Sequence, residues 1–299
     1  MLKKLFILGC NTNQVKYIKL INRNEWKIIG VDLNENAPGK IFCDKFYNVG
    51  YDNLSALIEI GKKEKFNKID HVFTAASQFA HKGAAHFAEY FGIQYPSEKT
   101  IDLCLNKSLY YKFFQEKNIP IPKTLYIKNE KELRLKLADL KTGEFYLKSD
   151  FSKNPNYVYK FNSSNIPWDD FFWGKDRYLR EYYILQEEIR GTSLRINIYG
   201  NSFNVFNFLT GEKTNLHNSL INSFKIIQTL KDFMSMLGIH KWLVKFDIIL
   251  HEDGYVVLDI GLDPPSRMIK LAEENKINFH KYYTDQYLID KISYPKFLN

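Results

Sequence analysis

Apolar and polar positions follow two different patterns along the first third of the chain. Continuous apolar runs at residues 5–8, 26–31 and 71–74 have the length of buried strands, whereas residues 14–24 and 54–66 repeat their apolar positions at helical spacing. Strands that alternate with helices in this way form a parallel sheet covered by helices. The pattern predicts a Rossmann-like domain at the N-terminus.

The pattern of apolar positions changes in the middle of the chain. Two successive helices are predicted within 97–117, and the segment NIPIPKT at 118–124 ends them, because each proline disfavours helix at its own position and at the preceding one. Strand-like runs separated by turn residues follow this junction and predict a mainly antiparallel sheet. These runs are 145–148, 158–161, 183–186, 193–199 and 204–209.

The last third begins with an apolar stripe and ends in a hairpin. The stripe comprises Leu220, Ile221, Phe224, Ile227, Leu230, Phe233, Met234 and Leu237. Its helical spacing predicts a helix that packs on the core, with Gly238 as the C-terminal cap. Two strands, 242–250 and 255–260, then flank the loop 251–254.

Two acids of this hairpin suggest a metal site. If the loop consists of Glu252, Asp253 and Gly254, then Asp247 lies directly opposite Asp259. Facing like charges repel at a Cβ separation of about 5 Å, and Mg²⁺ offsets the repulsion while it keeps phosphate oxygens as its other ligands. Two alternatives stay open: two solvated surface acids, or a register slipped by one residue that sends the side chains to opposite faces.

Composition narrows the class of protein. A length of 299 residues with 45% hydrophobic and 25% charged residues predicts a folded chain of more than one domain. The net charge of +8 is dispersed, which disfavours nucleic acid as a partner and suits either a nucleoside triphosphate or solubility alone. Cys10, Cys43 and Cys104 lack metal-site spacing and predict free thiols in a reducing cytoplasm. The first apolar run is too short for a signal segment or a membrane span, so a cytoplasmic location without membrane contact is expected.

The loop after the first predicted strand raises a rival function. The segment GCNTNQ at 9–14 lies where a dinucleotide-binding loop would lie, and Asp32 follows the second strand, where a ribose-binding acid is expected. The dinucleotide fingerprint needs two further glycines, but Asn11 and Gln14 stand in their places. A plain strand-to-helix turn is therefore favoured over a dehydrogenase.

Two lysines occupy positions from which an ammonium reaches phosphate oxygens. Lys107 begins a predicted helix and Lys148 ends a predicted strand. Most lysines are solvated surface residues, so neither indicates a phosphate site alone. Only the two lysines together indicate a phosphate site.

Taken in order, these pieces resemble the ATP-grasp superfamily over nearly the whole chain. The start is similar to the domain that precedes the ATP-grasp fold in biotin carboxylase and in ligases of purine and amino-acid metabolism, and the strand before Asn201 is similar to one of the ribosomal-protein glutamate ligases. The matching segments are GVDLNENAPGKIFCDKFYNV at 30–49, PSEKTIDLCLNKSLYYKFFQEKNIPIPKT at 96–124, FYLKS at 145–149, LQEEIRGTSLRINIYGN at 185–201 and VKFDIILHEDGYVVLDIG at 244–261.

The resemblance implies ATP and Mg²⁺ as cofactors and assigns residues to them. Lys107 and Lys148 hold phosphates, and Asp247 and Asp259 hold magnesium. Further nucleotide contacts are implied for Ser152 and Lys153 in a phosphate loop, for the hinge residues Gln186, Glu187, Glu188 and Ile189, and for Leu258. Arg195 and Arg267 are the expected contacts of the carboxylate and the acyl phosphate.

The resemblance also implies the fold and the reaction. An α/β, Rossmann-like pre-ATP-grasp domain at 1–95 is followed by a helical linker at 96–123, a small lid subdomain at 124–190 and an α+β large subdomain with the metal-binding hairpin at 191–299. The expected enzyme is a ligase that joins a small-molecule carboxylate to an amine through an acyl phosphate. Assembly as a homodimer is left open.

Three departures from the family pattern motivate rival functions. The phosphate loop at 152–156 has no glycine, Ser193 or Leu194 stands where relatives carry a ribose-binding acid, and Gly261 replaces a metal-binding asparagine, which leaves Asp263 or a water to take its place. One rival is a nucleotide-binding protein that has lost ligase activity. The other is a small-molecule kinase on the same scaffold.

Overall fold

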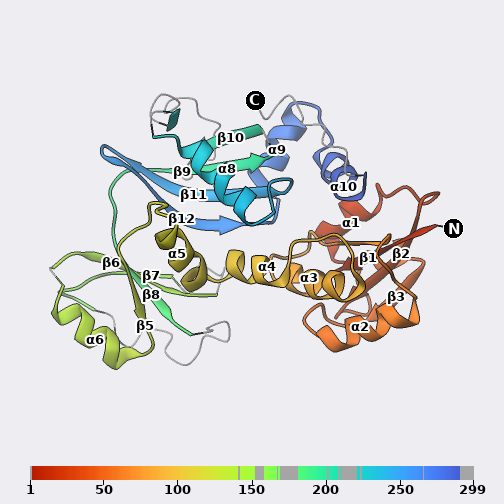
Figure 1. Cartoon of the computed structure of the whole chain (residues 1–299), viewed down its shortest axis with the longest axis horizontal. Helices are drawn as coiled ribbons and strands as arrows, with labels where there is room; N and C mark the ends of the chain where they lie inside the picture. Colours follow the sequence, from red (N-terminus) through yellow and green to blue (C-terminus); the bar gives the residue numbers. More distant parts are fainter. Residues whose placement is uncertain are drawn as a thin grey trace.

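Strands of the computed structural model form three four-stranded sheets within its described residues (Figure 1). The structure describes residues 2–140, 142–151, 158–166, 168, 181–200, 202–207, 210, 221–222, 224–264 and 266–289. Within this part of the chain, no helix combines the length and the apolar character needed to cross a membrane.

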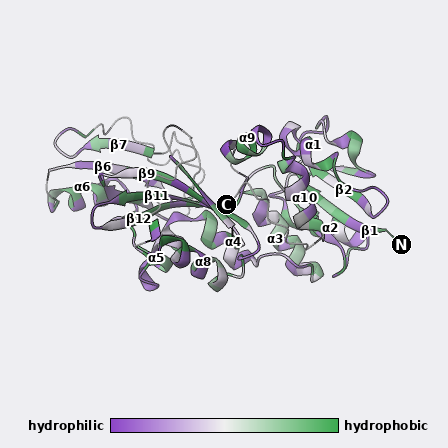
Figure 2. Cartoon of the chain, turned by 90° about the horizontal axis from the view of Figure 1, so that it is seen from above, coloured by the Kyte–Doolittle hydropathy of each residue, from purple (hydrophilic) through white to green (hydrophobic). Residues whose placement is uncertain are grey.

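The first sheet is parallel and has the strand order β3-β2-β1-β4. Its elements are β1 (Lys3–Leu8), α1 (Thr12–Ile18), β2 (Trp26–Asp32), the 3₁₀ helix η1 (Lys40–Phe42), β3 (Lys45–Asn48), α2 (Leu54–Lys63), β4 (His71–Phe73) and α3 (Ala80–Phe91). Strands β1 and β2 are largely hydrophobic because helices and loops cover both faces of a parallel sheet (Figure 2). The predicted Rossmann-like arrangement is confirmed.

Helix α1 is shorter than predicted, because it ends at Ile18 and not at Asn24. The side chain of Asn22 accepts a hydrogen bond from the backbone N–H of Asn24 and donates one to Glu25. Such local side-chain bonds offer the backbone an alternative to helix.

Two consecutive helices, α4 (Glu98–Leu105) and α5 (Lys107–Glu116), lead out of the first sheet as predicted. Asn106 separates them, because its backbone is extended and its side chain accepts a hydrogen bond from the N–H of Leu109. Lys107 is therefore the first residue of α5, and its own N–H donates to the carbonyl oxygen of Asp150 at 2.5 Å. This bond ties the start of α5 to the second sheet.

The second and third sheets are antiparallel, with the orders β5-β8-β6-β7 and β10-β9-β11-β12. The strands of the second sheet are β5 (Thr124–Ile127), β6 (Glu144–Ser149), β7 (Val158–Asn162) and β8 (Tyr183–Glu187), and helix α6 (Glu130–Ala138) lies between β5 and β6 in the chain. The strands of the third sheet are β9 (Thr192–Tyr199), β10 (Ser202–Asn207), β11 (Leu243–His251) and β12 (Gly254–Gly261), and helix α8 (Ile226–Met236) lies between β10 and β11 in the chain. A short connector, residues 188–191, joins β8 to β9 and so links the two sheets.

The apolar stripe forms its regular helix, α8, over only part of the predicted length. Lys225 precedes α8 with a left-handed φ of 51°, so the regular helix starts at Ile226, and Leu220 lies outside the described residues. Gly238 follows the helix with a φ of 68°, a conformation that glycine adopts without steric cost, and this confirms the predicted cap.

The last two helices pack against the N-terminal domain, which the sequence did not predict. Helix α10 (Phe279–Ile289) lies beside α1 in Figure 1, and α9 (Ser266–Glu274) contacts α10. Buried Phe279 and Tyr283 share one apolar cluster with Leu5, Tyr17 and Leu243. The C-terminal segment thereby fixes the third sheet to the first.

Candidate functional site

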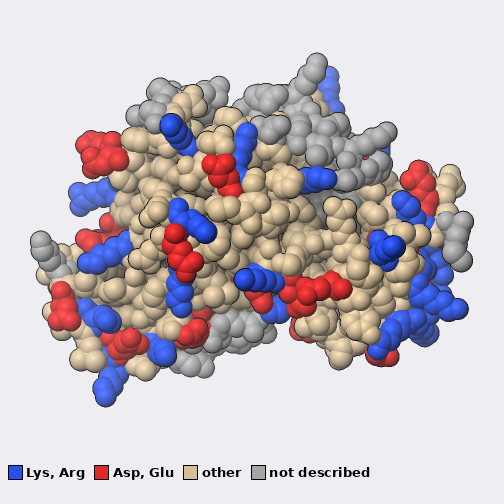
Figure 3. All heavy atoms as spheres, in the orientation of Figure 1, with Lys and Arg blue, Asp and Glu red and all other residues tan. Residues whose placement is uncertain are grey.

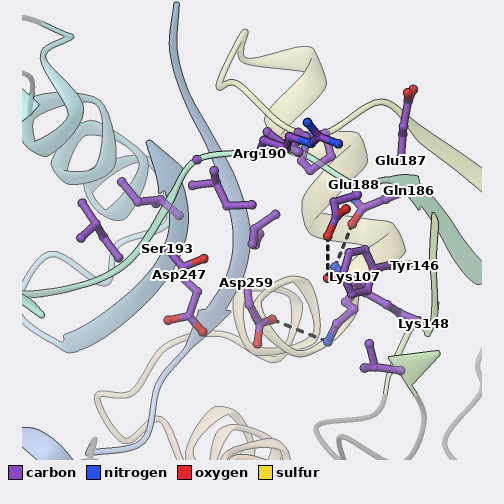
Figure 4. A pocket seen from close by; sticks show the side chains of 18 of the residues that line it. Lys107, Tyr146, Lys148, Gln186, Glu187, Glu188, Arg190, Ser193, Asp247 and Asp259 are labelled. Carbon is purple, nitrogen blue, oxygen red and sulfur yellow. Dashed lines mark hydrogen bonds and ion pairs between the residues drawn. The ribbon is translucent and has the colours of Figure 1, made fainter. Parts of the chain in front are cut away.

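A cavity of about 760 Å³ lies between the second and third sheets. Its polar and charged walls are Lys107, Tyr146, Lys148, Gln186, Glu187, Glu188, Arg190, Ser193, Arg195, Asp247 and Asp259. Its apolar walls are Pro122, Val158, Ile189, Leu194, Ile248, Ile249 and Leu258. Four of the lining positions are the two lysines and the two hairpin acids that the sequence singled out, and Figure 4 shows them around one space.

The hairpin brings Asp247 opposite Asp259, as predicted, but by a different route. The turn has two residues, Glu252 and Asp253, because His251 pairs with Gly254. With that turn alone, Asp247 and Asp259 would be out of register by one residue. Leu258 pairs with no residue on β11, however, and so forms a β-bulge that brings the two acids opposite each other. The predicted three-residue loop was wrong, and the bulge produces the same pairing.

The bulge also presents the carbonyl oxygen of Leu258 to helix α5. Tyr111 donates its hydroxyl hydrogen to this oxygen at 2.5 Å, and the Tyr110 hydroxyl lies 2.9 Å from Asp259 Oδ1. Burial, together with the charge of Asp259, raises the pKa of Tyr110 well above its ordinary value, so this phenol stays a hydrogen-bond donor. Helix α5 therefore fixes the position of one of the two acids.

Each acid has a cation beside it, which offsets the repulsion between the two carboxylates. Arg195 on β9 bonds both oxygens of Asp247, from Nε at 2.6 Å and from a terminal nitrogen at 2.8 Å. Lys107 Nζ lies 3.6 Å from Asp259 Oδ1, and the lysine is only 5% exposed. Burial by itself would lower the pKa of Arg195, but the hydrogen bond to Asp247 and the nearby carboxylates raise it.

Lys148 projects from β6 into the same cavity. Its ammonium donates to Gln186 Oε1 at 2.9 Å, and the Gln186 amide in turn donates to Thr124 at 2.9 Å, which fixes the amide's orientation. Burial lowers the pKa of Lys148 to about 8, although the charges of Asp259 and Asp247 act in the opposite direction. The ammonium is thus charged at neutral pH and has a carbonyl oxygen but no bonded carboxylate among the described contacts.

The connector between the two sheets forms the far end of the cavity. The N–H of Glu188 donates to the carbonyl oxygen of Glu144 at 2.8 Å, and its carboxylate pairs with Lys160 at 2.6 Å. Glu187 and Ile189 line the cavity on either side of it. Backbone groups and apolar side chains at this end suit a flat heterocycle, which needs few polar contacts in an otherwise apolar slot.

The acid pair fits a magnesium ion in its chemistry. Carboxylate oxygens are the ligands that Mg²⁺ prefers, and one or two of them suffice when phosphate oxygens complete the shell. Among the described residues there is no group of three or more His, Cys, Asp or Glu side chains around a common point. The protein therefore offers Asp247 and Asp259 as a pair, with Asp247 held by Arg195.

Some predicted residues lie elsewhere. Arg267 is on α9, where it donates to the carbonyl oxygen of Asn207 at 3.1 Å, and it is not among the residues that line this cavity. Ser152 and Lys153 lie outside the described residues. Asp263, offered as a replacement for the metal asparagine, instead pairs with Lys245 at 3.1 Å.

Four aromatic or charged residues that contribute to the site were not predicted from the sequence. Tyr110 and Tyr111 follow Lys107 by three and four positions, and this spacing puts all three on one face of α5. The signal was present in the sequence, because a helix that presents a phosphate-binding lysine presents these positions too. Tyr146 and Arg190 also line the cavity, but no local pattern marks them.

The segments at the carboxyl ends of β1, β2 and β4, here called the N-terminal crevice, use their polar residues differently. Asp32 Oδ2 accepts from the N–H of Cys10 at 2.6 Å, and Oδ1 accepts from the N–H of Asn34 at 2.8 Å. Gln14 is fully buried and bridges the ends of β1 and β4, because it bonds Leu8 and Ala75. The residues that suggested a dinucleotide site thus satisfy the protein's own backbone.

Comparison with known proteins gives the fold a class. No family model matches the sequence, and no curated protein matches it. Among solved structures, N5-carboxyaminoimidazole synthetase from Staphylococcus aureus is 13% identical with a TM-score of 0.70 and covers 98% of this chain and 78% of its own. An L-amino acid ligase from Bacillus licheniformis is 17% identical with a TM-score of 0.69, at 96% and 74% coverage.

For a third similar structure, the match spans nearly the whole length of both chains. The RimK domain protein ATP-grasp from Sphaerobacter thermophilus is 13% identical with a TM-score of 0.61, and the match spans 95% of this chain and 99% of that one. The protein therefore has the ATP-grasp fold with a Rossmann-like domain before it, as the sequence predicted.

Proposed function

We propose that this protein is an ATP- and magnesium-dependent ligase that joins a carboxylate to an amine through an acyl phosphate. The observation that carries the proposal is the grouping in one cavity of Lys107, Lys148, Asp247 and Asp259 from four different elements. Two ammonium groups and two opposed carboxylates suit a magnesium triphosphate. The related folds are of proteins named as ligases and synthetases, which agrees with this chemistry.

Different residues serve different roles in the first step, the formation of the acyl phosphate. The substrate carboxylate attacks the γ-phosphorus of ATP, an oxygen–phosphorus bond forms, and the bond to the bridging oxygen breaks as ADP leaves. Magnesium held by Asp247 and Asp259 would neutralise charge on the phosphate oxygens. Lys107 and Lys148 supply fixed positive charge to the same oxygens, and stabilisation of this kind acts without rearrangement during the reaction.

The second step is displacement of phosphate by the amine. The carbonyl carbon of the acyl phosphate accepts the nitrogen, and inorganic phosphate leaves. Arg195 lies beside Asp247 at the end of the cavity away from the connector, where the terminal phosphate would lie. We assign it to the acyl phosphate. Arg267 keeps this role only if α9 moves toward the cavity.

One observation favours a second candidate, a nucleotide-binding protein without ligase activity. Arg195 engages both oxygens of Asp247, so a metal ion that binds there competes with a bidentate ion pair. If the ion pair prevails, the cavity binds nucleotide and releases no ADP. The ligase remains the better supported function because Asp259 and both lysines face the same space (Figure 4).

The test is magnesium-dependent release of ADP in the presence of candidate substrates. The full chain is incubated with ATP, Mg²⁺ and pools of amino acids and small carboxylates, with and without amines. A ligase releases ADP only with a suitable carboxylate and yields an amide with the amine. Accumulation of a phosphorylated product without amide would indicate a kinase, and ATP binding without ADP under every pool would contradict the proposal.

A further inference from the structure

Two of the three cysteines lie next to each other in the N-terminal domain, although a whole strand separates them in the chain. Cys10 follows β1 and Cys43 precedes β3, and β2 lies between these two strands in the sheet. Both side chains belong to the same apolar cluster. Cys10 is fully buried, Cys43 is half-buried, and both are free thiols.

Glycine at position 30 of β2 provides the space in which the two sulfur atoms lie. Gly30 is buried within a parallel strand, where a glycine has no side chain to pack and often marks a close approach of other groups. A Cβ atom at this position would lie 2.5 Å from Cys43 Sγ and 2.9 Å from Cys10 Sγ. Both sulfur atoms therefore occupy the volume that a side chain of β2 would fill, and a larger residue at 30 would displace them.

Gly39, in the connection between β2 and β3, contacts both cysteines through its backbone. Its N–H donates to the carbonyl oxygen of Cys10 at 2.8 Å, and its carbonyl oxygen accepts a weak hydrogen bond from Cys43 Sγ at 3.5 Å. A Cβ atom at 39 would lie 2.8 Å from the same oxygen of Cys10, so glycine lets this segment approach closely. The main chain around the two thiols is thus held in place by its own bonds.

Cys43 is the more reactive thiol of the two. Arg23 lies beside it, because the guanidinium bonds the carbonyl oxygen of Phe42 at 2.7 Å and the carboxylate of Asp44 at 2.6 Å. The Cys10 side chain, followed by the charge of Arg23, lowers the pKa of Cys43, although burial and the charge of Asp44 act in the opposite direction. Partly exposed thiols beside a cation form the thiolate readily, and the thiolate is the nucleophile in thiol oxidation.

We propose that Cys10 and Cys43 form a modification site at which a hydroperoxide converts the two thiols into a reversible disulfide. This site is independent of the proposed ligase function. Disulfides in a reducing compartment are usually transient or redox-sensing, which agrees with two thiols that are adjacent and free. The bond would close residues 10–43 into a loop and join the end of η1 to the turn before α1.

The modification takes place in two steps. The Cys43 thiolate attacks one oxygen of the hydroperoxide, a sulfur–oxygen bond forms, and the oxygen–oxygen bond breaks. The departing oxygen takes up the proton that the thiol released, and Cys43 becomes a sulfenic acid. The Cys10 sulfur then attacks the Cys43 sulfur, a sulfur–sulfur bond forms, and hydroxide leaves with the proton of Cys10 as water. The two thiols supply the two electrons that reduce the peroxide, and an added dithiol reverses the bond by exchange.

Peptide mapping of the full chain after treatment with hydrogen peroxide tests the site. The reduced parent, Cys10→Ser, Cys43→Ser and Gly30→Ala are treated with the peroxide, with and without dimedone to capture sulfenic acid. They are then alkylated in denaturant and digested, and a portion of each digest is reduced with dithiothreitol. Cys104→Ser is the matched control, because Cys104 is a buried thiol on α4 outside this pair. Mass spectrometry quantifies linked peptides, dimedone adducts and alkylated thiols.

The expected result is a single linkage within one chain. The parent and Cys104→Ser should both yield peptides joined through Cys10 and Cys43, which dithiothreitol separates. Cys10→Ser lacks the second thiol and should accumulate dimedone-labelled Cys43, whereas Cys43→Ser should leave Cys10 reduced. Gly30→Ala should form the linkage about tenfold more slowly, because the added Cβ displaces both sulfur atoms.

Several other outcomes would overturn the assignment. If both thiols of the parent stay reduced at a peroxide exposure that oxidises free glutathione, the two cysteines only pack against each other. Linkage between two copies of the chain, seen as a dimer on a non-reducing gel, would exclude the bond within one chain. Equal dimedone labelling of Cys43 in the parent and in Cys10→Ser would show that Cys10 does not react. If Gly30→Ala does not fold, Cys10→Ser decides, and absence of a Cys43 adduct there overturns the proposal.

Discussion

The N-terminal crevice and the cavity between the second and third sheets both collect polar side chains, but they use them in opposite ways. In the crevice, Gln14 and Asp32 bond backbone groups of their own domain. In the cavity, Lys148 and Lys107 project from a strand and a helix toward a space between sheets. The difference teaches that an acid or amide at a strand end indicates a ligand only when the surrounding backbone has not already engaged it.

Surface charge does not separate these two regions. On the face that Figure 3 shows, Lys and Arg are interspersed with Asp and Glu, with a denser group of cations over the N-terminal domain. The domain with the denser surface charge is the one whose crevice is closed by its own residues. Buried charge is therefore the better guide to the site.

The largest effect is expected for Asp259→Asn in the cavity. The amide keeps a hydrogen bond to Tyr110 but removes a negative charge beside Lys107, so ADP release should fall by about 100-fold or more while the fold persists. A magnesium-dependent ADP assay and thermal unfolding measure the two quantities. The matched control is Asp253→Asn in the turn of the same hairpin, which is exposed and should change neither. Full activity of Asp259→Asn would leave the acid pair without a role.

Gln14→Leu in the N-terminal crevice should have the opposite effect: it should lower stability and leave ATP binding unchanged. The substitution leaves the N–H of Ala75 and the carbonyl oxygen of Leu8 without a buried partner, which should lower the free energy of unfolding by about 2 kcal/mol. ATP affinity, measured by calorimetry, should stay unchanged. Gln115→Leu, on the exposed face of α5, is the control for the substitution itself. A variant of parent stability that binds ATP more weakly would erase the contrast between the two regions.

The pKa of Lys148 predicts a pH dependence of ATP binding. Because this pKa lies near 8 in the free protein, the ammonium is charged at pH 7 and mostly neutral at pH 9. Triphosphate requires the charged form, so affinity should be about tenfold lower at pH 9 than at pH 7. Arginine keeps its charge throughout this range, so Lys148→Arg should bind with little change between the two pH values. A parent affinity that does not fall by pH 9 would show that Lys148 does not contact the triphosphate.

The smallest effect is expected for Asp32→Ala. The loss of two hydrogen bonds from backbone N–H groups should lower the free energy of unfolding by about 1 kcal/mol, measured by denaturant titration. Neither the parent nor the variant should bind NADH, since the carboxylate is already engaged with Cys10 and Asn34. Saturable NADH fluorescence with the parent, lost in the variant, would restore the dehydrogenase as a candidate.

The sequence predicted most elements and, among the charged residues of the cavity, the two lysines and the two hairpin acids, because these depend on local periodicity and on strand register. The pairing of Asp247 with Asp259 was predicted with a loop that the structure does not have, since a bulge adds a residue without any composition signal at Leu258. Partners across elements, such as Arg195 with Asp247, follow from the neighbouring strand β9 and are invisible to reasoning along one hairpin.

Long-range packing marks the other limit of prediction. Neither α9 nor α10 was predicted from the sequence, and the periodicity of their apolar positions would not say which domain they cover. The same holds for Gln14, whose bonds to Ala75 join segments distant in the chain. Lys245 and Gly261 looked unrelated in sequence, yet the lysine stem occupies the space that a side chain at 261 would need.

The bulge at Leu258 bears on how related chains should be aligned. A two-residue turn with a bulge and a three-residue turn without one contain the same number of residues between the two acids, so an alignment of such chains shows no gap. A lineage can therefore exchange one hairpin geometry for the other by point substitution alone. In chains that keep the bulge, a tyrosine at the position of Tyr111 keeps the carbonyl oxygen of the bulged residue as its acceptor, and covariation of that tyrosine with the turn sequence would trace the exchange.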